Sequence, residues 1–176
     1  MNFNKLINIS KKGKSLTIIN CKNGAQWLSN GYALYKVADT PVFTEESLKM
    51  VIPEGSKWRI ETKEEETLFV NLSECCEHDE NASEICKTLL VREDETYMLM
   101  QGSSGRMVAV NSTFLSPIKL NENIFFTIRY NYCVVKDGLL PVAIILPIRQ
   151  EFAQSMISEI EKFSSYIEET EELEGV

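Results

Sequence analysis

Two Asn-Gly steps in the first fifth of the chain constrain the fold more than any other feature of this sequence. They separate three short runs of strand-forming residues, at 15–21, 25–29 and 32–37. An Asn-Gly pair between two such runs favours a tight type I′ turn, because both central residues of that turn need a positive φ. The sequence therefore predicts a three-stranded antiparallel meander.

Helices are expected before and after this meander. Residues 2–10 carry apolar side chains at helical spacing. Residues 44–52 begin with a threonine suited to an N-cap, and two glutamates follow in the first turn, where the helix dipole favours them. A short helical turn fits 112–118, capped by Asn111 or Ser112.

Short strands account for most of the remaining chain. The predicted strands are 56–62, 67–72, 86–92, 96–101, 106–110, 124–130 and 139–147. The polar, acidic stretch 73–85 is expected to be an exposed loop, and Pro141 suggests that the last strand begins at a sheet edge. Tight connections favour antiparallel sheets with two or three short helices, which is an α+β fold.

The hydrophobic pattern changes near Arg149, and this divides the chain. With 176 residues it has room for one compact domain, predicted over 1–149, and an appendage. Apolar residues then recur at spacings of three and four, which predicts an amphipathic, acidic C-terminal helix with a frayed end over 150–176. This apolar stripe is formed by Phe152, Met156, Ile160, Phe163 and Ile167.

The chain is expected to be cytoplasmic and to have no membrane partner. It contains no apolar run of about 18 residues, the length of a transmembrane helix. Its first 15 residues are basic but lack the apolar segment and cleavage site of a signal peptide.

The charges are unevenly distributed along a chain whose net charge is −8. Residues 1–36 contain no acidic side chain and hold six lysines, whereas residues 159–176 contain seven glutamates and one lysine. The lysines are Lys5, Lys11, Lys12, Lys14, Lys22 and Lys36. Clustered lysine attracts nucleic-acid phosphates regardless of base sequence. The alternative is a solvated basic surface that pairs with the acidic end of this chain or of a neighbour.

Residues with catalytic or metal-binding chemistry are sparse. His78 is the only histidine, and neither the H-E-x-x-H nor the G-x-S-x-G motif is present, so no enzymatic activity and no cofactor are indicated. One cluster has ligands suited to zinc: Cys75, Cys76, His78 and Cys86. It lacks paired C-x-x-C knuckles, so free thiols in a reducing compartment are favoured and no metal is assigned.

Three segments resemble the last domain of bacterial DNA polymerase sliding clamps. They are VAVNSTFLSPIKL at 108–120, FFTIRY at 125–130 and LLPVAIILPIR at 139–149. The N-terminal helix and the strand pair QWLSNGYAL at 26–34 are also compatible with a clamp domain, and the matching motifs cover about 40 residues. The resemblance implies repeated helix-plus-strand units whose helices line a basic inner surface facing duplex DNA. The residues that would face or lie near phosphate are Lys5, Lys11, Lys12 and Lys14.

The same resemblance implies a groove for partner peptides beside the closing strand. The residues that match the clamp's closing run are Leu146, Pro147, Ile148 and Arg149. A clamp protomer has three domains and this chain has room for one, so a ring would need several copies.

Three functional hypotheses follow from the sequence. The leading one is a non-enzymatic clamp-like module, of the kind that phages or mobile elements carry, which binds DNA or replication proteins. The alternative is an assembly module without nucleic acid that oligomerises through the C-terminal helix, with the stripe from Phe152 to Phe163 as the partner surface. The third is a small enzyme or zinc protein that uses the Cys75–Cys86 loop.

Overall fold

The computed structural model describes residues 1–38, 42–52, 57–68, 72, 83–92, 95–102, 107–129, 132–148, 155 and 158. Within these residues the chain forms two α-helices, two short 3₁₀ turns and ten strands. The helical elements are α1 (Phe3–Ser10), α2 (Glu45–Val51), η1 (Glu65–Thr67) and η2 (Ser112–Leu115). The strands are β1 (Ser15–Asn20), β2 (Gln26–Ser29), β3 (Ala33–Val37), β4 (Arg59–Glu64), β5 (Ser83–Arg92), β6 (Glu95–Gly102), β7 (Met107–Asn111), β8 (Ile124–Arg129), β9 (Tyr132–Asp137) and β10 (Leu140–Ile145).

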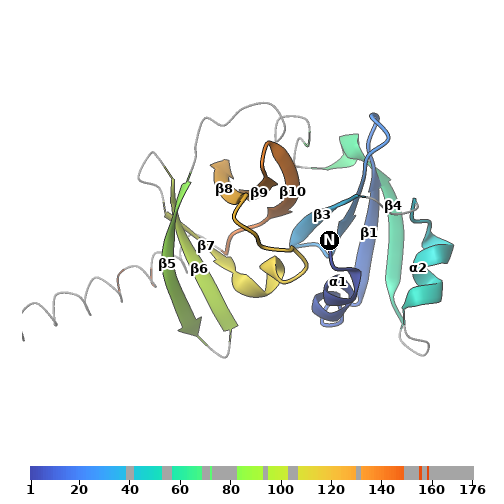
Figure 1. The fold of residues 1–176 in the computed structure, drawn as a ribbon. Coiled ribbons are helices and arrows are strands. Elements are labelled where there is room, and N and C mark those ends of the chain that lie inside the picture. The colour runs from blue at the N-terminus through green and yellow to red at the C-terminus, as the bar shows by residue number, and fades with distance from the viewer. Residues whose placement is uncertain are drawn as a thin grey trace, which may run out of the picture.

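Two sheets organise these strands (Figure 1). The larger has seven strands in the order β4-β1-β2-β3-β10-β9-β8, and the smaller has the order β5-β6-β7. All neighbours pair antiparallel except β1 and β4, which run parallel from Ser15↔Arg59 to Asn20↔Glu64. The described residues therefore have mixed α and β structure, as the sequence predicts.

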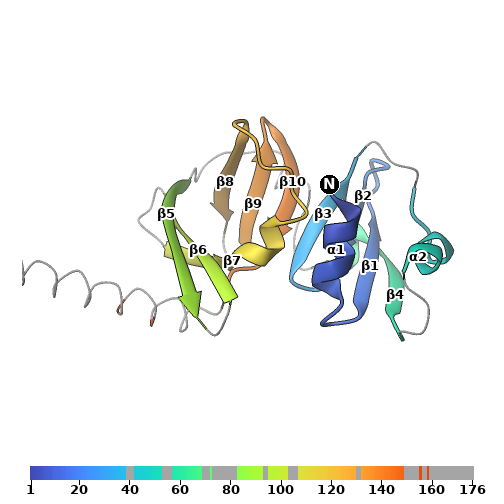
Figure 2. The same cartoon turned by 60° about the horizontal axis from the view of Figure 1, so that its bottom comes forward.

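The larger sheet contains two similar units that meet at its centre. One consists of α1 followed by β1, β2 and β3, and the other of η2 followed by β8, β9 and β10. The two meanders join through antiparallel pairing of β3 with β10, from Ala33↔Ile145 to Tyr35↔Ala143. Because the strand order is the same from either side of this junction, an approximate twofold axis relates the units. Figure 2 shows α1 and η2 on the same side of the larger sheet.

Apolar side chains cover both faces of the larger sheet. The main core lies between the sheet and the layer formed by the helices and the smaller sheet, and it includes Leu6 of α1, Tyr35 of β3 and Leu115 of η2. A smaller cluster on the opposite face includes Trp27 and Ile144. Burial on both faces explains why β2 and most of β9 are buried without the alternation of a half-exposed strand.

The structure confirms the predicted meander, both α-helices and the caps expected at Thr44 and Asn111. The turn glycines Gly24 and Gly31 have positive φ, but Asn23 and Asn30 do not, so the predicted type I′ geometry is wrong for both Asn-Gly pairs. The Thr44 side chain accepts from Ser47 N–H in a capping box, and the Asn111 side chain accepts from Thr113 N–H. The C-terminal helix predicted over 150–176 lies outside the described residues, apart from Ser155 and Ser158, which are helical.

Several strand predictions are wrong. Residues 132–137, which were not assigned to a strand, form β9 between β8 and β10. The predicted strand at 67–72 does not begin at Thr67, which ends η1, and its residues 69–71 lie outside the described part. The predicted loop at 73–85 is wrong at its end, because β5 begins at Ser83. Residues 73–82 lie outside the described part of the chain.

Pro141 lies at the start of β10, where the described pairs connect this strand to β9 alone; pairing with β3 begins at Ala143, so the strand begins at a local edge, as predicted. Beyond this point β10 lies between β3 and β9 inside the larger sheet. The β9–β10 register shifts between Pro141 and Ala143, so the proline is accommodated at an irregularity in the ladder. A bulge is the other place where a strand tolerates a residue without an N–H donor.

A buried glutamine fastens the segment before α2 to the meander. Gln26 Oε1 accepts from Phe43 N–H at 2.8 Å, and Gln26 Nε2 donates to Phe43 O at 3.0 Å and to Asn20 Oδ1 at 2.9 Å. The Phe43 ring stacks on Phe3 with 5.2 Å between centroids, which also connects this segment to α1. The side-chain amide thus makes the two hydrogen bonds to the Phe43 backbone that a neighbouring strand would otherwise make.

We expect Gln26→Leu to lower the free energy of unfolding by about 1–3 kcal/mol, because it leaves the Phe43 N–H and C=O without their partner. Urea unfolding followed by circular dichroism measures the change. Gln101→Leu, at an exposed position of β6, is the matched control and should change stability little. Equal stability of the two variants would contradict the fastening role.

Candidate nucleic-acid interface

Helix α1 presents one apolar face to the core and one polar face, which carries a single lysine, to solvent. Asn2 caps its first turn, since Asn2 Oδ1 accepts from Lys5 N–H at 3.1 Å. Leu6, Ile7 and Ser10 are buried, and Ser10 Oγ donates to Leu6 O at 2.7 Å. Because these residues occupy the inner face, Lys5 is exposed on the outer one.

The turn after α1 carries three more exposed lysines. Lys11 closes the helix through its N–H, which donates to Asn8 O, and Lys12 and Lys14 follow. Two hydrogen bonds hold the end of this turn: Lys14 N–H donates to Ser10 O at 2.8 Å, and Lys14 O accepts from Arg59 N–H at 2.8 Å. The negative end of the helix dipole favours cations at this position.

Few carboxylates compete for these lysines. Among the described residues, Lys12 is the only one of the four with a carboxylate oxygen within 4 Å; its Nζ lies 3.5 Å from Glu95 Oε1. The Lys12 side chain is 92% exposed, so this ion pair contributes little. A hydrogen bond from Tyr97, with smaller contributions from Lys12 and Asn111, lowers the pKa of Glu95, which therefore stays ionised. The pairing partner suggested by the sequence, 159–176, lies outside the described residues.

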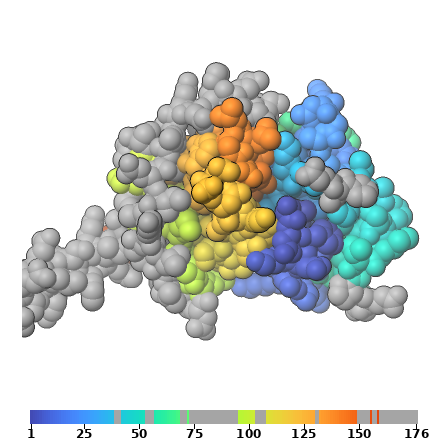
Figure 3. Space-filling model, in the orientation of Figure 1, coloured from blue at the N-terminus to red at the C-terminus, as the bar shows by residue number. Residues whose placement is uncertain are grey.

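The basic helix lies beside the second unit of the larger sheet. Asn2 N–H donates to Pro117 O at 2.7 Å, just after η2, and the opposite end of α1 approaches β6 through Lys12 and Glu95. Tyr35 Oη, from β3 below, donates to Phe114 O at 2.8 Å. The two helical elements consequently share one face (Figure 2), where the dark blue atoms of α1 lie next to the gold atoms of the segment around η2 (Figure 3).

The structure adds two cations that the sequence did not indicate. The parallel pairing of β1 with β4 places Arg59 opposite Ser15, directly after the lysine turn, and exposed Lys57 precedes β4. These residues are more than 40 positions from Lys14 in the chain. No local motif marks them, and only knowledge of the parallel pairing would have found them.

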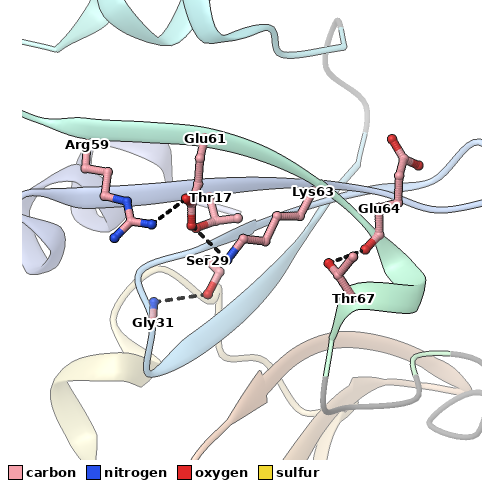
Figure 4. Close-up of polar contacts among 8 residues, drawn as sticks. All are labelled: Thr17, Ser29, Gly31, Arg59, Glu61, Lys63, Glu64 and Thr67. Atoms are coloured by element: carbon pink, nitrogen blue, oxygen red, sulfur yellow. Dashed lines mark hydrogen bonds and ion pairs between the residues drawn. The ribbon is translucent and has the colours of Figure 1, made fainter.

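Charges alternate along the edge strand β4, and one of its carboxylates also contacts β1 (Figure 4). Glu61 lies between Arg59 and Lys63, at 2.8 Å and 2.9 Å from their nitrogens, and accepts from Thr17 Oγ1 at 3.2 Å. The hydrogen bonds from Lys63 and Arg59 lower the pKa of Glu61 to about 2. Arg59 is therefore partly neutralised, and charged side chains on an edge strand also discourage pairing with other chains.

The closing run proposed for partner binding makes backbone contacts within the chain. Leu146, Pro147 and Ile148 are half-buried. Leu146 N–H donates to Tyr32 O at 2.9 Å, and Ile148 N–H donates to Ala109 O of β7 at 2.9 Å, so the run links the two sheets. The remaining predicted partner residues lie outside the described part of the chain: Arg149, Phe152, Met156, Ile160 and Phe163.

An apolar cavity of about 130 Å³ lies at the other end of β10. Its walls include Tyr35, Ile118, Leu140 and Val142, and Lys36 is its one charged lining residue. The run from Leu146 to Ile148 does not line it, so this cavity does not correspond to the partner groove that the resemblance implies.

Three of the four candidate zinc ligands lie outside the described residues, so the structure does not test this cluster. They are Cys75, Cys76 and His78, whereas Cys86 belongs to β5. Cys133 is buried in β9, which raises the pKa of its thiol to about 12, and Cys21 is half-buried just after β1. Cys133 is thus a small core residue.

Comparison with known proteins gives no relative for this arrangement. No model of a protein family matches the chain, and neither a curated protein nor a solved structure matches it. No helix in the described part is long and apolar enough to cross a membrane.

We expect Glu61→Gln to lower the free energy of unfolding at neutral pH by up to about 1 kcal/mol, because the ion pairs are partly exposed. The Glu61 pKa is lower in the folded state, so its contribution is complete above the ordinary pKa of 4.5 and is lost as pH falls towards 2. The difference between wild type and variant, measured by urea unfolding across this range, should therefore shrink on acidification.

The matched control is Glu122→Gln, which removes an exposed carboxylate next to the opposite sheet edge. A pH-independent difference for Glu61→Gln would show that the carboxylate does not act through its charge.

Proposed function

We propose that this protein is a non-enzymatic, clamp-like module that binds the sugar-phosphate backbone of duplex DNA through α1 and the turn that follows it. The observation that supports this most directly is the exposure of Lys5, Lys11, Lys12 and Lys14 on one helix-turn segment, with a single weak contact to a carboxylate among the described residues. Lysine ammonium groups bind phosphates as point charges, so the binding is expected to be independent of base sequence.

Electrostatics favours this surface over the rest of the molecule. The chain as a whole carries −8, so a polyanion is repelled from most of it. Each lysine that neutralises a phosphate releases a condensed counterion, and the affinity therefore falls steeply as salt increases. Arg59 and Lys57 lie at the border of the basic surface and extend it towards β4.

The arrangement of the two units is compatible with the resemblance to sliding clamps. Two helix-plus-strand units side by side, with α1 and η2 on one face, are what the resemblance implies for a surface that faces DNA. The second α-helix is a poor candidate for contact, because Glu45 and Glu46 occupy its first turn beside a single Lys49. We place the DNA-facing surface on α1 and η2 for this reason.

We expect K11E/K12E to weaken binding to a fluorescently labelled random-sequence duplex by roughly tenfold or more in low salt. The plot of log affinity against log salt should lose about 0.9 in slope for each phosphate contact removed. Fluorescence anisotropy between roughly 50 and 200 mM KCl measures both quantities.

The matched control is K22E/K49E, which changes the net charge equally but alters lysines that already pair with Glu66 and Glu45. Circular dichroism verifies that both variants are folded. If K11E/K12E binds DNA no worse than this control, the basic face is a solvated surface and the proposed function is wrong.

A further inference from the structure

One lysine of the basic surface has a backbone conformation that lysine disfavours. Lys14 has φ of 48°, and it is the only residue other than glycine with positive φ among the described residues. The other three are Gly24, Gly31 and Gly138. A residue with a Cβ is destabilised in this left-handed region, which glycine enters freely.

A glycine stands next to Lys14 but does not take the left-handed position. Gly13 is not among the residues with positive φ, and a Cβ built on it would meet no atom within 4 Å. A lysine would therefore fit at position 13, and a glycine at position 14 would relieve the conformational cost. The observed order, Gly-Lys, is the less stable of the two.

The backbone of Lys14 is also held more firmly than that of a free turn residue. Its N–H donates to Ser10 O of α1, and its C=O accepts from Arg59 N–H at the start of β4, each at 2.8 Å. The side chain therefore extends into solvent from a backbone position that is held between α1 and β4. Pre-ordering of this kind reduces the entropy lost when a side chain binds a ligand.

We propose that Lys14 is a principal phosphate-binding residue of the DNA-binding surface. The left-handed turn is retained because it fixes the backbone position from which the Lys14 side chain extends. This inference rests on the proposed function and deepens it. The two backbone hydrogen bonds of the turn offset part of the conformational cost at Lys14, and phosphate binding is the function for which the remaining strain is retained. The ligand class is the phosphodiester backbone of nucleic acid.

The swap variant G13K/K14G tests this with net charge and composition unchanged. We expect its Tm to rise by about 2–4 °C, because both positions then have residues that suit their backbone. We also expect the salt slope for duplex binding to fall by about 0.9, the value of one phosphate contact. K14Q should lower the slope equally without the rise in Tm, whereas K49Q, on α2, should leave it unchanged.

The outcomes separate this inference from the proposed function. If the swap raises Tm but binds DNA like the wild type while K11E/K12E binds weakly, the surface binds DNA and Lys14 has no special part in it. A fall in Tm would show that the left-handed turn is not strained, and it too would overturn the inference. If neither K11E/K12E nor the swap affects binding, the proposed function itself fails.

Discussion

The antiparallel pairing of β3 with β10 is the interaction on which the rest of the structure depends. It joins strands from the two ends of the described chain, and Ala33, Tyr35, Ala143 and Ile145 at this junction are fully buried. Without it, each unit would be a three-stranded meander with a short helix, too small to exclude water from its core. The pairing also fixes which face the helices share, because each packs on its own half of one continuous sheet.

The basic surface is partly a consequence of this packing. Once α1 buries Leu6 and Ile7, Lys5 on its outer face is exposed to solvent, as are the lysines of the following turn, so exposure alone does not distinguish a binding surface from a solubilising one. Two further facts favour binding: carboxylates are scarce among the described neighbours, and a lysine, not the adjacent glycine, has the left-handed conformation in the turn. The packing of α1 does not require carboxylates to be scarce there.

Turn and capping residues in the sequence predicted those elements that depend only on neighbouring residues in the chain. The Asn-Gly turns gave the first meander, and side-chain caps gave α2 and η2. Strand β9 was missed because it is covered on both faces and even Lys136 is buried, which removes the alternation that identifies a half-exposed strand. The parallel β1–β4 pair depends on distant residues, so the predicted candidate site contained the lysines of α1 and its turn but not Lys57 or Arg59.

An acidic protein can bind a polyanion only if its charges act locally. At physiological ionic strength the Debye length is about 8 Å, so a phosphate at the surface of α1 interacts chiefly with charges within the adjacent turn and strand. There Lys5, Lys11 and Lys14 lack a carboxylate partner among the described residues, whereas the acidic side chains of α2 and η1 belong to other elements. The net charge of −8 therefore affects the affinity for DNA less than it affects the orientation in which DNA approaches. Because the rest of the surface repels DNA, the α1 face is the favourable place for contact.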